Sequence, residues 1–78
     1  MVKVNVENGC YIFKLDDILD NNNLSKNKVM RDTNTDFKVL QIIINGDLSK
    51  MDVTVFARLC DYLDCKLNDI VEYIPNNN

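Results

Sequence analysis

Residues 24–47, LSKNKVMRDTNTDFKVLQIIINGD, decide the fold, because they have the pattern of two short helices joined by a tight turn. Ser25 is a favourable N-cap, since its hydroxyl can accept a hydrogen bond from the first turn of a helix. The spacing predicts that this first helix runs over residues 26–33. Asn34 follows the helix and tolerates the left-handed backbone that a sharp turn requires.

The second half of the stretch predicts another helix over residues 37–45. Asp36 is placed as its N-cap, and Gly46 stands just past its end, where glycine commonly stops a helix in the left-handed conformation. Leu40 and Ile43 are three residues apart and share one side of this helix. The turn between the two helices is therefore only about three residues long.

Two further helices and a short strand are predicted downstream. Asp52 is placed as the N-cap of a helix over residues 53–63. A final short helix is expected over residues 67–71, and residues 72–74 favour a short strand that ends at a proline. The apolar stripe of the longer helix consists of Val55, Phe56, Leu59, Cys60 and Leu63.

Upstream, residues 2–13, VKVNVENGCYIF, show the period-two alternation of a strand. Asn8–Gly9 suits a hairpin turn because both residues accept positive φ, and residues 10–13 are expected to return as a second strand. A lone hairpin is marginal in water. It therefore either closes the domain or joins residues 71–74 in a sheet between two subunits. A helical period follows over residues 14–22, in which one face carries Leu15, Ile18 and Leu19.

These elements predict one mainly α-helical domain that spans residues 1–78. Five short helices occupy residues 14–71, a strand or hairpin arm precedes them at residues 1–13, and a C-terminal strand and tail follow at residues 72–78. A chain of 78 residues is too short for a two-domain enzyme. Its 46% hydrophobic and 27% charged residues are typical of a globular protein.

The composition argues against most catalytic and metal sites. The chain has no histidine, which removes the commonest general base and most zinc sites. Its three cysteines lack metal-ligand spacing, and their odd number fits a reducing cytoplasm better than a disulfide framework. We therefore expect a cytoplasmic protein that is not an enzyme and has no cofactor, metal or small-molecule ligand. We also expect no signal peptide and no membrane span.

Two other sets of polar residues have plain structural interpretations. Asp16 and Asp17 are expected to lie on a solvated helix face rather than to act as paired catalytic acids. Tyr62 and Tyr73 are expected to be half-buried packing residues rather than platforms on which bases stack.

The central stretch and VTVFARLCDYLDCKLNDIV at residues 53–71 resemble the phage-repressor and Cro class of helix-turn-helix domains, often called the Xre family. The resemblance covers about residues 13–71 and holds without gaps from Leu24 to Gly46. It implies a five-helix repressor-like DNA-binding domain. The positions that match apolar family positions are Val29, Met30, Leu40, Ile43, Phe56, Leu59, Leu63, Leu67 and Ile70.

The resemblance implies a transcriptional regulator that binds double-stranded DNA, usually as a homodimer, with the second helix of the motif in the major groove. Lys38 and Gln41 are implied to read bases, because lysine donates to guanine and glutamine can pair with adenine. Ser25 and Lys26 are implied to hold phosphates. The groove-facing positions are Asp36, Phe37, Lys38, Gln41 and Ile42, and candidates for further backbone charge are Lys28, Arg31 and Lys50.

Two residues depart from the family pattern. Asn34 stands where the turn usually holds glycine, which is a mild change because asparagine tolerates positive φ. Ile42 belongs to three successive isoleucines that lie about 100° apart on a helix and cannot all face the core. Ile43 continues the buried stripe, so Ile42 is expected to point outward. It either contacts thymine methyls beside Phe37, or weakens DNA binding, or contacts another protein.

The net charge of −3 is unevenly distributed. Residues 24–50 carry five Lys and Arg against three Asp, a net charge of +2, whereas residues 1–23 sum to −2 and residues 51–78 to −3. The basic segment is thus the one that would face phosphate, with modest affinity per monomer and a need for dimerisation. The acidic total and Ile42 leave an alternative, a protein-interaction module or antirepressor of the same fold with weakened DNA binding.

Overall fold

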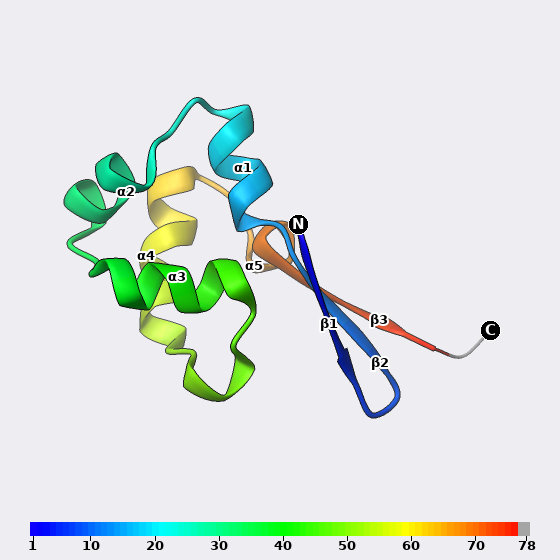
Figure 1. Ribbon diagram of the computed structural model, residues 1–78. Helices are drawn as coiled ribbons and strands as arrows, with labels where there is room; N and C mark the ends of the chain where they lie inside the picture. The colour runs from blue at the N-terminus through cyan, green and yellow to red at the C-terminus, as the bar shows by residue number, and fades with distance from the viewer. Residues whose placement is uncertain (77–78) are drawn as a thin grey trace.

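The computed structural model describes residues 1–76, in which five α-helices pack beside a three-stranded antiparallel sheet (Figure 1). The predicted fold class, mainly α with an N-terminal hairpin and a C-terminal strand, is confirmed. Asn77 and Asn78, the end of the predicted tail, lie outside the described residues. The elements are β1 Val2–Val6, β2 Gly9–Phe13, α1 Leu15–Asn21, α2 Lys26–Thr33, α3 Phe37–Asn45, a 3-10 turn η1 Leu48–Lys50, α4 Val53–Leu63, α5 Leu67–Ile70 and β3 Val71–Pro75.

The ends of α2 and α3 confirm most of the predicted capping. The Ser25 hydroxyl oxygen accepts a hydrogen bond from the Lys28 backbone N–H over 3.1 Å. Asn34 has φ 52° and Gly46 has φ 76°, so both adopt the left-handed conformation that ends their helices. Asp36 differs from the prediction, because it has the extended backbone of an N-cap but its side chain makes no capping hydrogen bond.

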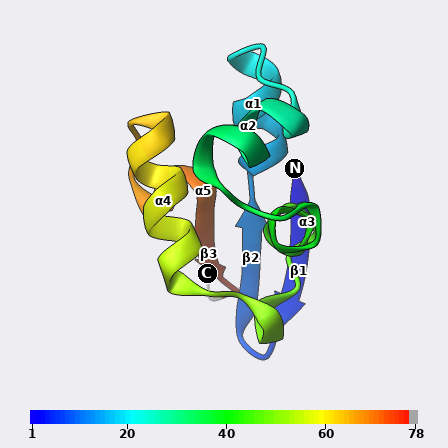
Figure 2. The same cartoon turned by 90° about the vertical axis from the view of Figure 1, so that its left-hand side faces the viewer.

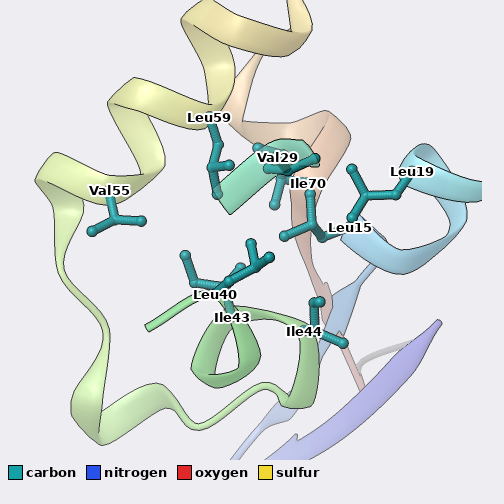
Figure 3. Packing of buried hydrophobic residues seen from close by; sticks show 9 residues of the cluster. All are labelled: Leu15, Leu19, Val29, Leu40, Ile43, Ile44, Val55, Leu59 and Ile70. Atoms are coloured by element: carbon teal, nitrogen blue, oxygen red, sulfur yellow. The ribbon is translucent and has the colours of Figure 1, made fainter. Parts of the chain in front are cut away.

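Nine buried side chains contributed by the five α-helices form the core between α1, α2, α3 and α4 (Figure 3). Full burial of one such side chain stabilises a fold by about 1.5–3 kcal/mol, so this cluster dominates the packing. Helix α3 contributes three of its members on one side, and Ile42 is only half-buried. The nine are Leu15, Leu19, Val29, Leu40, Ile43, Ile44, Val55, Leu59 and Ile70.

The hairpin turn lies one residue earlier than predicted. Val6 pairs with Gly9, so the two turn residues are Glu7 and Asn8, and neither has positive φ. Gly9 instead belongs to β2, where the neighbouring strand passes very close to it. A Cβ at Gly9 would meet the carbonyl oxygen of Ile74 and would lie 2.7 Å from the Tyr73 hydroxyl. Close approach of β3, rather than turn geometry, is therefore the reason for this glycine.

The C-terminal strand pairs within its own chain. The strand order is β1-β2-β3, with Phe13 opposite Val71 and Tyr11 opposite Tyr73. The hairpin thus closes the domain, and the alternative of a sheet between subunits through residues 71–74 is not observed. Val71 was predicted to end the last helix, but it begins β3, because its pairing with β2 outweighs the helical pattern. No helix among residues 1–76 is long and apolar enough to cross a membrane.

Candidate nucleic-acid interface

Helices α2 and α3 form the predicted helix-turn-helix. The chain leaves α2 at its C-terminal end, turns sharply, and enters α3, which runs along one side of the helical body (Figure 1). Figure 2 views the molecule from the side of α2 and shows α3 nearly end-on in front of the sheet. One side of α3 is buried in the core through Leu40, Ile43 and Ile44. Its opposite side is therefore the part of the motif that is available to a ligand.

Two buried threonines hold the turn between the helices. Thr33 and Thr35 are 8% and 5% exposed. The Thr33 hydroxyl donates a hydrogen bond to the Val29 carbonyl oxygen over 2.7 Å. The Thr35 hydroxyl donates to the Thr33 carbonyl oxygen over 3.2 Å, and the two hydroxyl oxygens lie 2.8 Å apart. Arg58 of α4 donates from Nη1 to the Asn34 carbonyl oxygen over 3.5 Å. The threonine bonds satisfy buried polar groups, and the exposed Arg58 bond joins α4 to the turn between α2 and α3.

The outward side of α3 carries a shallow hollow of about 300 Å³. Two of its lining side chains are apolar, with Phe37 54% exposed and Ile42 half-buried. The structure therefore brings together four of the residues that the sequence predicted for base contact. The hollow is lined by Phe37, Lys38, Gln41, Ile42, Asn45 and Asp47.

A chain of hydrogen bonds crosses this surface from α2 to the end of α3. The Lys26 ammonium donates to Oε1 of Gln41 over 3.2 Å, and Nε2 of Gln41 donates to Oδ1 of Asn45 over 3.0 Å. The Lys26 Nζ also lies 6.0 Å from the centroid of the Phe37 ring, at the outer limit of a cation–π contact. The predicted phosphate residue Lys26 and the predicted base reader Gln41 thus form one network.

Two other predicted residues, Asp36 and Lys50, lie at a second hollow that shares Ile42 with the first. Asp36, Ile42 and Lys50 line it together with the turn and the start of α4, in a space of about 490 Å³. Lys50 is paired with Asp47 at 3.7 Å. Ile42 belongs to both hollows and therefore marks the boundary between them. Ser25 is exposed at the start of α2, where its hydroxyl serves as the N-cap.

The cations of this region differ in how firmly they are paired. Lys28 and Arg31 both lie against Asp32, at 3.0 Å and 3.7 Å, on the exposed side of α2. The Tyr62 hydroxyl donates to Asp32 over 2.6 Å, and this bond, followed by the Lys28 contact, lowers the pKa of the Asp32 carboxyl. These two cations thus share one carboxylate, and Lys28 is held more closely by it than Arg31.

Lys26, Lys38 and Arg58 take part in no ion pair among residues 1–76. Two of them flank the outward side of α3, and the third lines the second hollow. Arg58 belongs to residues 51–78, whose net charge is −3, so the charge of each sequence segment placed it in an acidic flank. The folded chain places it beside the basic motif instead.

Sequence reasoning missed Asn45, Thr33, Thr35 and Arg58. Asn45 could have been found, because it lies four residues after Gln41 and therefore shares its helix face. The threonines carry no such signal, since their bonds depend on the turn being formed. Arg58 is brought to the turn only by the packing of α4 against α2, a contact between residues 24 positions apart.

The residues predicted to have structural roles show ordinary contacts. Asp16 and Asp17 lie 2.8 Å and 3.5 Å from the Met1 amino group and remain partly exposed. Tyr62 is half-buried, and its hydroxyl joins α4 to α2. Tyr73 is more exposed than predicted, at 44%, because it lies on the edge strand β3, although its ring centroid is 5.1 Å from that of Tyr11. Within residues 1–76, no group of three or more potential metal ligands is found.

Comparison with known families agrees with this geometry. A family model described as a Cro/C1-type HTH DNA-binding domain matches residues 14–76. The matched residues include all five α-helices and β3, whereas β1 and β2 precede them. The comparisons with curated proteins and with solved structures found no match.

Proposed function

Since the chain belongs to the family of Cro/C1-type HTH DNA-binding domains, we propose that it is a sequence-specific transcriptional regulator that acts in the cytoplasm. This family is one of DNA-binding domains and not of enzymes. We propose further that α3 inserts into the major groove, where Lys38, Gln41 and Ile42 meet base edges. The supporting observation is the outward side of α3, which carries Lys38 and Gln41, has Lys26 of α2 hydrogen-bonded to it, and is opposite to the side buried in the core.

Phosphate contacts are proposed on both sides of α3. Ser25 and Lys26 stand at the start of α2, where free backbone N–H groups and the helix dipole favour an anion. Lys50 and Arg58 line the second hollow at the other side. Asp36 also lies there and would repel phosphate, so we propose that it faces the groove without holding phosphate.

Dimerisation is proposed because one monomer offers few cations and the chain is acidic overall. Two copies would place two α3 helices in successive major grooves, about 34 Å apart, on a two-fold operator. Linking two weak contacts in one complex raises the overall affinity without any new contact by either copy. Sedimentation equilibrium with and without the operator duplex measures the number of copies in the complex directly.

The direct test is fluorescence anisotropy with duplexes from the chain's own promoter region. We expect at least one duplex to bind more tightly than random DNA, with an affinity that falls steeply as salt rises. Gln41→Ala should remove part of the preference for the specific duplex, whereas Lys28→Met should not, because Lys28 already pairs with Asp32. Equal binding of specific and random duplexes at low salt would contradict the proposal.

A second candidate function is a protein-interaction module that keeps the fold, such as an antirepressor. The observation in its favour is the apolar pair on the outward side of α3, where Phe37 is 54% exposed beside half-buried Ile42. Ile42→Arg separates the two functions, and Leu67→Arg adds the same charge at an exposed apolar position on α5. Higher DNA affinity for Ile42→Arg alone favours a weakened DNA reader, whereas loss of a protein partner favours the interaction module.

A further inference from the structure

We propose that Lys26, which lies outside α3, determines which hydrogen-bonding groups Gln41 and Asn45 of α3 present to DNA bases. The proposal rests on the proposed DNA-binding function and makes it more specific, because it names the base that these residues prefer. Its basis is the chain of bonds from the Lys26 ammonium to Gln41 and from Gln41 to Asn45.

The orientation of both amides follows from the chemistry of the first group in this chain. An ammonium only donates hydrogen bonds, so the Gln41 atom that faces Lys26 at 3.2 Å has to be the carbonyl oxygen. The NH₂ group of Gln41 then faces Asn45. The Asn45 atom that accepts from it at 3.0 Å has to be Oδ1, which turns the Asn45 NH₂ group away from Gln41. One charge on α2 thus orients two side chains on α3.

The oriented amides offer mainly donors to a ligand. Gln41 keeps one free N–H after its bond to Asn45, and Asn45 keeps two. Lys26 and Lys38 add ammonium donors at the same hollow or beside it. In the major groove, guanine alone presents two adjacent acceptors, O6 and N7. We therefore expect guanine at the base that Gln41 and Asn45 contact, in place of the bidentate pairing with adenine that a free glutamine favours.

Nearby charges leave this network undisturbed. Asp47 lines the same hollow, but its carboxylate accepts from the Ser49 hydroxyl over 3.1 Å and lies 3.7 Å from the Lys50 ammonium. Lys26 has no carboxylate partner among residues 1–76, so its ammonium remains available to Gln41. Lys28, two residues along the same helix, is held by Asp32 and provides a matched control.

The first test is selection of binding sites from a randomised duplex library with the full-length wild type, Lys26→Met, Lys28→Met and Gln41→Ala. The base that loses its preference in Gln41→Ala identifies the contacted position. At that position we expect the wild type and Lys28→Met to favour guanine. In Lys26→Met the preference for guanine over the other bases should be weaker by a factor of at least about five. The base preferences at the other positions of the selected DNA site should not change. A retained guanine preference in Lys26→Met, or an adenine preference in the wild type, overturns the proposal.

The second test needs no DNA. In ¹⁵N-resolved NMR spectra of the free protein, Lys26→Met should shift the side-chain amide signals of both Gln41 and Asn45, and Lys28→Met should shift neither. Unchanged signals in Lys26→Met overturn the proposed control by Lys26 even if the wild type binds a specific site. A wild type that binds no duplex better than random DNA refutes the proposed function, and the preference for guanine with it.

Discussion

Gly46→Ala is expected to be among the most destabilising single changes near the interface. Gly46 ends α3 with φ 76°, a conformation that side chains other than glycine and asparagine rarely adopt. It also lies against the sheet, where an added Cβ would be 2.7 Å from Cγ2 of Val4 and 2.9 Å from Cδ1 of Phe13. Phe13 is fully buried, so its ring has no open space into which it can move.

Two costs add in this variant. The left-handed backbone costs an alanine about 1–2 kcal/mol relative to glycine. Crowding of a well-packed core costs about 1–3 kcal/mol more. The free energy of unfolding should therefore fall by about 2–5 kcal/mol, and for a domain of this size the melting temperature should fall by at least about 8 °C. Such a loss is a large share of the stability of a small domain.

Asn34→Ala isolates the backbone cost. Asn34 has φ 52° on the exposed turn between α2 and α3, and its side chain makes no hydrogen bond among residues 1–76. This variant should lose only about 1 kcal/mol. Urea unfolding followed by circular dichroism, with equal slopes for both variants, measures the difference. If Gly46→Ala costs no more than Asn34→Ala, the close packing of Gly46 against Phe13 does not govern stability.

Three further changes test the supports of the motif. Thr33→Val should lower the free energy of unfolding, measured in urea, by about 1–3 kcal/mol, because it breaks a buried hydroxyl network. Thr33→Ser keeps the hydroxyl and should recover most of this loss. Equal losses in the two variants would show that the hydroxyl is not the cause. Ser25→Ala should cost about 0.5–2 kcal/mol through loss of the N-cap, and Ser25→Gly only a few tenths, in thermal melts. Tyr62→Phe should raise the pKa of Asp32 toward its ordinary value of 3.8, as seen by carboxyl ¹³C NMR. Because the folded pKa of Asp32 is lowered, the stabilisation is present above about pH 4 and is lost as the pH falls through the folded pKa. Wild type and Tyr62→Phe should therefore differ in stability at neutral pH and converge in acid; a constant difference would exclude this carboxyl as the cause.

Local chemistry in the sequence determined the helices and their ends. Ser25, Asn34, Gly46 and Asp52 act through their own backbone or through the nearest N–H groups, so each could be predicted from its neighbours alone. The buried side of α3 followed from spacing for the same reason. The outward residues of α3 were also predictable, because a helix that buries one side must expose the other.

Tertiary structure decided what depends on contacts between distant residues. Val71 leaves the helical pattern because β2 is in place to pair with it, and Gly9 is required where β3 passes close, not where the hairpin turns. In the same way, the bond from Lys26 to Gln41 joins residues 15 positions apart and exists only after α2 and α3 have packed. The sequence by itself determined which side of α3 faces outward. Only the folded chain decided how that helix presents its hydrogen-bonding groups, because their orientation depends on a charge supplied by another element.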